Sequence, residues 1–201
     1  LTQCQNRIKQ LQQCYQQFSS EAKERLDGSD SSSGRSEKSL TSDGVILQLL
    51  HRIEAIDPNV EINCHYSPSS SSSHISKDPY LRQALENSRA YMSADGRPIQ
   101  VILFAKELRT TDAIDEVLRH ELTHVHDYLS RKYDMTTCEG LASSEIRAAK
   151  NGECFRYRHF PSFIQNSCIK KTAIASTCNI FPSEGENCVK RVFERSIEDQ
   201  S

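Results

Sequence analysis

Residues 114–129 read IDEVLRHELTHVHDYL, and this stretch decides the predicted fold. Its apolar residues recur three or four positions apart, which is typical of one face of an amphipathic helix. They are Ile114, Val117, Leu118, Leu122, Val125 and Leu129. Within the helix, residues 120–124 match the pattern H-E-x-x-H, so two imidazoles one turn apart project from the same face. The sequence therefore predicts a helix that presents a pair of metal ligands.

His120 and His124 are the predicted ligands of a Zn²⁺ ion, because neutral imidazole nitrogens at this spacing can share one metal. Glu121 is the candidate general base, since a carboxylate beside the metal can take a proton from water. A pattern of five residues also arises by chance, and the alternative is a pair of surface histidines. The position of the motif in mid-helix, after a predicted edge strand at 99–105, is the zincin arrangement and favours the metal site.

A catalytic zinc ion usually has three protein ligands, so a further ligand is required. Glu145 is the candidate, because it lies on a separate predicted helix at 141–150 whose small residues would let that helix approach the first one closely. Glu139 and Glu153 are rival carboxylates without such neighbours. The alternative for Glu145 is an ordinary charge on a helix surface.

Two polar residues just after the motif are not expected to bind the metal. Asp127 lies about 10 Å along the helix axis from His120, too far to share a tetrahedral ion with both histidines. We expect Asp127 to hold a ligand imidazole or the end of the next helix, and a purely structural carboxylate is the alternative. His126 points away from His124 around the helix and is predicted not to bind metal.

The rest of the chain predicts one α-rich α+β domain over residues 1–201, with its catalytic core at about 95–155. Further helices are predicted at 1–26, 42–56, 79–92, 162–178 and 186–198, and short strands at 60–64 and 99–105. Two serine-rich insertions, at about 27–41 and 67–76, can bury almost nothing. They explain much of the low hydrophobic content of 36%.

Charge and hydropathy exclude several classes of protein. The 25 Lys and Arg nearly balance the 27 Asp and Glu, so the chain lacks the basic field that holds nucleic acid. Its apolar runs fall far short of the roughly 20 residues that cross a bilayer. The segment that begins at Leu1 shows neither a secretory nor a mitochondrial presequence pattern. We therefore expect no nucleic-acid partner and no transmembrane helix.

Three segments together resemble a known family: HELTHVHD at 120–127, SEIRAA at 144–149 and GEC at 152–154. They are closely similar to the mitochondrial inner-membrane metalloproteases, which process and help assemble the membrane sector of ATP synthase. The resemblance is strong over about residues 95–155. It implies a gluzincin-like fold, zinc endopeptidase activity and the intermembrane space. By position it also implies that His120, His124 and Glu145 are zinc ligands and that Glu121 is the general base. Asp127 matches the aspartate of the family motif.

Eight cysteines are about twice the number expected for a cytosolic chain of this length. Five lie ten residues apart on predicted terminal helices: Cys4, Cys14, Cys168, Cys178 and Cys188. Such neighbours are about 15 Å apart on one helix, so they would have to pair between helices. The spacing and the resemblance favour disulfides over reduced thiols and predict that the N-terminal helix is linked to the C-terminal helices. Cys64, Cys138 and Cys154 would supply the remaining partners.

The connectivity stays open, because eight cysteines allow 105 pairings. The family usually has cysteines where this chain has Ser67, Phe104 and Ser143, which leaves the disulfide pattern and the substrate undecided.

The leading hypothesis is a zinc-dependent endopeptidase of the intermembrane space, peripheral to the inner membrane, that matures a hydrophobic subunit of ATP synthase and helps assemble it. The strand at 99–105 would hold an extended substrate by strand addition. Tyr157 or His159 could stabilise the oxyanion. One alternative is an assembly chaperone that binds the subunit without essential proteolysis, although the intact Glu121 counts against a purely non-catalytic role. Another is a secreted, disulfide-rich metalloprotease.

Overall fold

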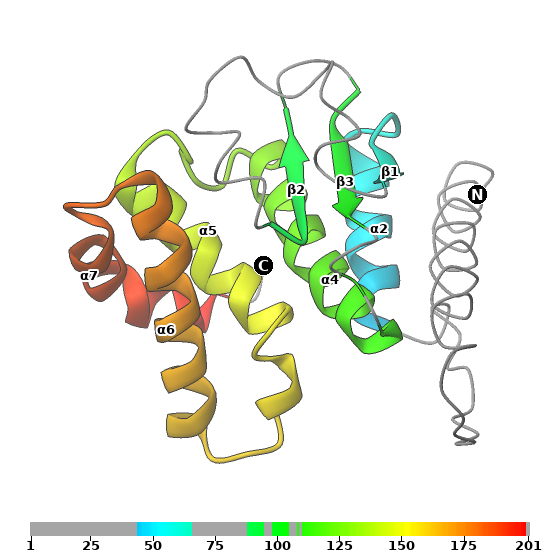
Figure 1. Cartoon of the computed structure of the whole chain (residues 1–201). Helices are drawn as coiled ribbons and strands as arrows, with labels where there is room; N and C mark the ends of the chain where they lie inside the picture. The colour runs from blue at the N-terminus through cyan, green and yellow to red at the C-terminus, as the bar shows by residue number, and fades with distance from the viewer. Residues whose placement is uncertain (1–43, 66–87, 95–97, 105–107, 109, 200–201) are drawn as a thin grey trace, which may run out of the picture. The chain divides into compact units, whose positions relative to one another are not determined.

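The computed structural model describes residues 44–65, 88–94, 98–104, 108 and 110–199 (Figure 1). The predicted helix at 1–26, both serine-rich insertions and most of the predicted helix at 79–92 lie outside these ranges. The described residues form two compact units: one holds those within 44–54 and 58–115, apart from the gaps given above, and the other holds 55–57 and 116–199. No helix in this part of the chain is both long enough and apolar enough to span a bilayer.

Helix α2 (Gly44–Ile56) confirms the helix predicted at 42–56. Its apolar residues have helical spacing, and four of them are buried: Ile46, Leu49, Leu50 and Ile53. The helix ends just before Asp57-Pro58, because a proline ring disfavours helical geometry in the residue that precedes it.

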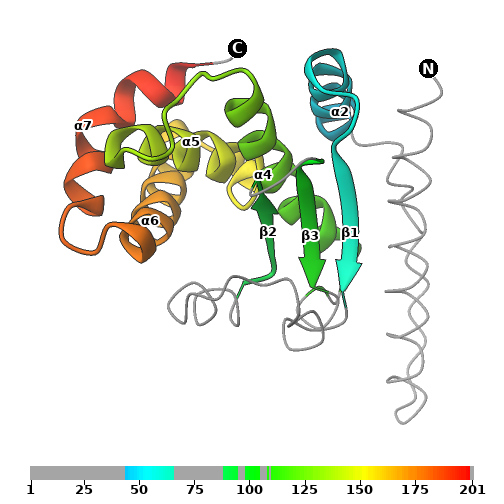
Figure 2. The ribbon, with the colours of Figure 1, turned by 90° about the horizontal axis from the view of Figure 1, so that it is seen from above.

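The first unit also contains a three-stranded sheet, formed by β1 (Glu61–His65), β2 (Ala90–Ser93) and β3 (Gln100–Phe104) (Figure 2). The strand order is β1-β3-β2, with β1 parallel and β2 antiparallel to β3. Residues 101–104 of the central strand are all buried, which is typical of a strand covered on both faces. β1 confirms the strand predicted at 60–64.

Two predictions for this unit are wrong. The helix predicted at 79–92 does not include residues 90–92, which belong to β2 and pair with β3. The strand predicted at 99–105 is not an edge strand, because β3 is paired along both sides within the described sheet. It therefore offers no edge for strand addition by a substrate. Strand pairing between segments distant in sequence decides where β2 forms and whether β3 is central. The local spacing of apolar residues does not reveal this pairing.

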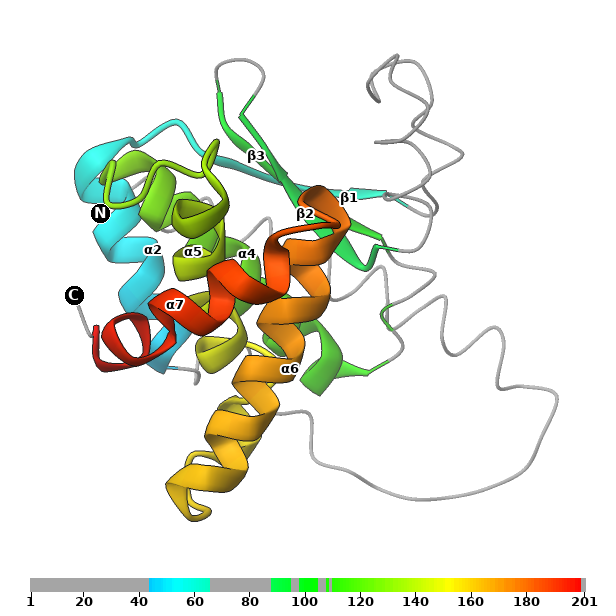
Figure 3. The same ribbon diagram turned by 90° about the vertical axis from the view of Figure 1, so that its left-hand side faces the viewer.

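The second unit is helical (Figure 3). It contains α4 (Thr111–Leu129) from Glu116 onward, α5 (Cys138–Asn151), the 3₁₀ helix η4 (Phe155–Tyr157), α6 (Ser162–Ile180) and α7 (Gly185–Glu198). The four α-helices confirm those predicted from residue 114 to the C-terminal end. Helices α5, α6 and α7 share an apolar core of Ala142, Ile146, Ala149, Ile169, Ala173, Val189, Val192 and Phe193.

Helix α5 begins at a capped turn. Thr137 is the N-cap, and its Oγ1 accepts a hydrogen bond from the N–H of Gly140 at 3.1 Å. A Cβ on Gly140 would lie 1.9 Å from the carbonyl oxygen of Asp134, so a larger residue could not be placed here without opening the turn. This turn sets the direction of α5, the helix that carries Glu145.

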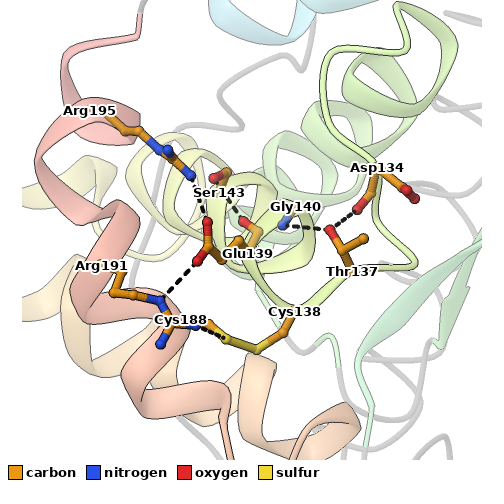
Figure 4. The surroundings of a disulfide bond; sticks show 9 residues. All are labelled: Asp134, Thr137, Cys138, Glu139, Gly140, Ser143, Cys188, Arg191 and Arg195. Carbon is orange, nitrogen blue, oxygen red and sulfur yellow. Dashed lines mark hydrogen bonds and ion pairs between the residues drawn. A yellow bond between two sulfur atoms is a disulfide. The ribbon is translucent and has the colours of Figure 1, made fainter.

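Two disulfides join the helices of the second unit. Cys138–Cys188 links the start of α5 to α7, and Cys154–Cys168 links the turn after α5 to α6. Figure 4 shows the first of them, together with the ion pairs from Glu139 to two arginines of α7. The C-terminal helices are therefore cross-linked to α5 and to the turn that follows it.

The predicted link between the N-terminal helix and the C-terminal helices is wrong for Cys168 and Cys188, whose partners lie in and just after α5. Cys178 is a free thiol. It lies where α7 turns back on α6, and a Cβ on Gly185 would be 2.9 Å from its Sγ. Cys64 is disulfide-bonded, whereas the predictions for residues 4 and 14 lie outside the described ranges.

Candidate metal centre

Helices α4 and α5 bring together the three predicted metal ligands. The Nε2 atoms of His120 and His124 are 3.0 Å apart. The Glu145 carboxylate lies 3.6 Å from His120 Nε2 and 3.5 Å from His124 Nε2. Each side chain is only 10–12% exposed. The histidines share a face of α4 because they are four residues apart, and Glu145 faces them from the next helix.

Hydrogen bonds orient both imidazoles in the same way. His120 Nδ1 lies 3.0 Å from Glu153 Oε2, and because an ionised carboxylate only accepts, Nδ1 must carry the proton. Ser144 Oγ donates to Asp127 Oδ2 at 3.0 Å, so it accepts from His124 Nδ1 at 2.8 Å. In the neutral form of each ring, the proton on Nδ1 leaves the lone pair on Nε2. Both lone pairs therefore face Glu145.

This donor set fits a divalent cation. Two imidazole nitrogens and one carboxylate are a combination that binds catalytic zinc in proteins. Glu145 Oε2 is buried and has no hydrogen-bond partner among the described residues. A buried, unsatisfied carboxylate oxygen is costly unless a cation or a donor faces it. The three side chains can therefore hold one metal ion, with the unpartnered oxygen as a ready ligand.

Burial and charge shift the pKa values of the cluster in a way that matters for metal uptake. Burial lowers the pKa of His120, but the carboxylates of Glu153, Glu145 and Glu121 raise it more, to about 10. Burial and the charge of His120 lower the pKa of His124 to about 3. Burial raises the pKa of Glu145. Without a metal, His120 thus carries a second proton, on Nε2, while His124 stays neutral, and an entering cation must displace that Nε2 proton.

Glu121 is buried beside the cluster, with 8% of its surface exposed. It follows His120 directly on α4, and its charge contributes to the raised pKa of that histidine. A carboxylate held this close to two metal ligands and shielded from bulk water is suited to accepting a proton from a water molecule in the site.

Asp127 connects the two helices, as expected from the sequence. It is completely buried and accepts hydrogen bonds from Arg147 and from Ser144, both on α5. Through the Ser144 hydroxyl it reaches His124, so it holds a candidate ligand imidazole indirectly. His126 lies 3.6 Å from Asp127 and is not among the three clustered side chains, and that it binds no metal stays a prediction.

Polar contacts accompany the approach of α4 and α5, and the predicted role of the small residues of α5 stays a prediction. The small residues Ala142 and Ala149 pack in the apolar core with α6 and α7. Polar contacts join α4 to the end of α5: Arg119 Nε donates to the carbonyl of Asn151 at 2.8 Å, and Asn151 Nδ2 donates to Thr123 Oγ1 at 3.1 Å. Ser144, a small residue of α5, contacts His124 directly.

Gly152 brings Glu153 to His120. It is the C-cap of α5, and a Cβ there would lie 2.9 Å from the carbonyl oxygen of Glu116 and 3.0 Å from His120 Cβ. Only a glycine permits this approach without moving α4. From the sequence alone, Glu153 is a rival metal ligand. Its role as the hydrogen-bond partner of His120 Nδ1 depends on the turn at Gly152, which motif spacing does not reveal.

The remaining sequence candidates lie in other surroundings. Glu139 forms ion pairs with Arg191 and Arg195 near the start of α5. Tyr157 packs edge-on against Phe160, with a centroid distance of 5.9 Å, and His159 is exposed. A contribution of Tyr157 or His159 to an oxyanion site remains a prediction.

The chain is similar in sequence to a family of known proteins. The model of the peptidase M76 family matches residues 36–201. The mitochondrial inner membrane protease ATP23 of Candida albicans is 33% identical over 112 residues, which cover 49% of this chain and 47% of that protein. Its namesake in Botryotinia fuckeliana is 41% identical over 59 residues, covering 29% and 24%. The chain thus matches less than half the length of these relatives. No solved structure matches it.

Proposed function

Because this chain belongs to the peptidase M76 family, we propose that it is a zinc-dependent endopeptidase with His120, His124 and Glu145 as metal ligands. The observation that carries the proposal is the convergence of two imidazole Nε2 atoms and a buried carboxylate oxygen that accepts no hydrogen bond from the described residues. We also propose that the helices that carry these residues are arranged as in the zincins.

Zinc bound here would act as a Lewis acid toward the scissile carbonyl and would make water more acidic. Glu121 accepts the proton of the attacking water on its carboxylate and returns it to the leaving amine. His120 and His124 keep their Nε2 atoms in place because their Nδ1–H groups are held by Glu153 and Ser144. Burial of these groups strengthens each electrostatic interaction in the site.

The proposed setting is the mitochondrial intermembrane space, peripheral to the inner membrane. The relatives are named mitochondrial inner membrane proteases, and disulfides persist in oxidising compartments. The proposed substrate, a hydrophobic subunit of ATP synthase whose maturation and assembly the enzyme assists, rests on the resemblance of the sequence motifs. An assembly role that does not require cleavage is the second candidate, favoured by the same resemblance.

Removal of the metal is expected to abolish peptide hydrolysis. Treatment with o-phenanthroline should inactivate the purified chain, because the buried histidines and Glu145 would lose the ion that they hold. Cleavage of an unstructured reporter protein is measured before treatment, after it, and after addition of one equivalent of Zn²⁺, which should restore activity. The non-chelating isomer m-phenanthroline is the control. Cleavage that persists in the fully metal-depleted protein would exclude a metallopeptidase.

A further inference from the structure

Exposed aromatic side chains gather at the turn between η4 and α6. Phe163 is 71% exposed and Phe160 is 55% exposed. Figures 1 and 3 show this turn, coloured yellow, and the start of α6 at one end of the second unit, beyond α7. Residues 155–163, read FRYRHFPSF, are called the aromatic tip below. Large aromatic rings on a projecting turn are unusual unless a partner covers them.

The aromatic tip is held in shape by covalent and polar contacts. The disulfide Cys154–Cys168 closes its base, and Gln165 Nε2 donates to the carbonyl of Cys154 at 3.4 Å. Within the tip, the N–H of Phe160 donates to the carbonyl of Tyr157 at 2.9 Å, and the two rings pack edge to face. The exposed rings are therefore presented by a fixed scaffold, so little conformational entropy would be lost on binding.

Positive charge surrounds these rings. Residues 154–183 contain no aspartate or glutamate, although the whole chain has 27. Arg156 and Arg158 are exposed, and Lys170 and Lys171 follow on the exposed side of α6. The Arg158 guanidinium lies 4.1 Å from the centroid of Phe155, and that of Arg156 lies 5.2 Å from the centroid of Tyr157. This excess of positive charge on and after the tip would attract an anionic partner.

We propose that the aromatic tip inserts into the headgroup region of an anionic lipid bilayer. Phe160 and Phe163 would enter the boundary between headgroups and acyl chains, where aromatic rings are favoured. Arg156 and Arg158 would contact lipid phosphates. A bilayer is favoured as the partner because it offers both an interfacial layer for the rings and phosphates for the arginines. This inference rests on the membrane-peripheral location proposed above and identifies the surface responsible.

The tip is directly joined to the candidate metal centre. Glu153, which holds His120, immediately precedes Cys154 at the base of the tip. Only a short segment, braced by the Cys154–Cys168 disulfide, therefore separates the proposed bilayer contact from Glu153 and the candidate ligand that it holds. Membrane binding at this place would present the site to protein segments that emerge from the bilayer.

Co-sedimentation of the full chain with vesicles tests the proposal. The chain is expected to bind phosphatidylcholine vesicles that contain cardiolipin and to bind vesicles of phosphatidylcholine alone much more weakly. Phe160→Ala combined with Phe163→Ala, and Arg156→Gln combined with Arg158→Gln, should each lower the partition coefficient about tenfold or more. Ile180→Ala is the matched control, because Ile180 is 58% exposed at the opposite end of α6. It should bind as the parent does.

Three results would overturn the proposal: equal binding to neutral and anionic vesicles, normal binding by both double variants, or an equal loss in Ile180→Ala. Thermal unfolding shows that each variant is folded, and hydrolysis of a soluble peptide is measured in parallel. A chain that binds vesicles without hydrolysing the peptide would contradict the peptidase and leave the tip's role intact. Variants that bind vesicles normally but no longer cleave a hydrophobic protein would assign the tip to the substrate instead.

Discussion

Glu121→Gln is expected to lower kcat for peptide hydrolysis by about a thousandfold or more, within the range attributed to general acid–base catalysis and its loss. The amide has nearly the same shape as the carboxylate but cannot accept a proton from water. Because Glu121 is buried beside His120 without being one of the three proposed ligands, the metal content should stay at the parental value. Steady-state kinetics and metal analysis of the same preparation measure both effects.

Asp112→Asn provides a control for Glu121→Gln. It removes a carboxylate from the same helix, but from the exposed first turn of α4. Its activity should stay within a few-fold of the parent. If Glu121→Gln retained comparable activity, the proposed base would be wrong. In cells that lack the protein, restoration of subunit assembly by Glu121→Gln would show that the assembly role does not depend on cleavage.

Asp127→Asn is expected to reduce the free energy of unfolding by about 3–5 kcal/mol, because removing one partner of a buried ion pair leaves the other charge uncompensated. The Arg147 side chain is 6% exposed and Asp127 is completely buried, so water cannot replace the lost carboxylate. The substitution also weakens the acceptor that orients the Ser144 hydroxyl toward His124. Denaturant unfolding of the metal-depleted proteins measures stability without a contribution from metal binding.

Glu139→Gln is the matched control for Asp127→Asn. Glu139 also pairs with arginines, Arg191 and Arg195, but these side chains are 45–66% exposed. Solvent screening makes such exposed pairs much weaker than a buried one, so Glu139→Gln should cost far less stability than Asp127→Asn. Equal losses of stability in the two variants would contradict the importance of the buried contact between α4 and α5.

The helices and the histidine pair were predictable because local rules determine them. Apolar spacing locates α2 and α4, and a separation of four residues places His120 and His124 on one face whatever surrounds the helix. Strand β2 was missed because its pairing with β3 is a long-range contact. For the same reason, the sequence did not show that β3 is central rather than an edge strand.

The partners of the imidazoles were the least predictable part of the site. From the sequence, Glu139, Glu145 and Glu153 are all possible ligands, and only their positions in three dimensions distinguish them. Glu145 faces the Nε2 atoms, Glu153 contacts His120 Nδ1, and Glu139 forms ion pairs with arginines of α7. In the sequence, Ser144 stands out only as a small neighbour of Glu145 and as the first residue of the SEIRAA motif. Its hydroxyl gains a role because α5 places it between His124 and Asp127.

The cysteines show a similar limit. Their regular spacing suggested rungs between the terminal helices, but a disulfide requires Cα atoms about 6 Å apart, which the tertiary packing decides. Cys138–Cys188 and Cys154–Cys168 meet this requirement, with Cα distances of 6.0 and 5.8 Å. Cys178, at the same ten-residue interval, remains a free thiol.

Metal analysis of the parent, Glu145→Ala and Glu153→Ala tests the central claim most directly. Both variants truncate a carboxylate next to His120, but only Glu145 faces the Nε2 atoms. The parent should contain about one zinc per chain, the number that a single site with three protein ligands holds. Glu145→Ala should lose it, whereas Glu153→Ala should keep it at saturating zinc with affinity about 10–100-fold lower. Full zinc occupancy in Glu145→Ala would contradict the proposed metal centre.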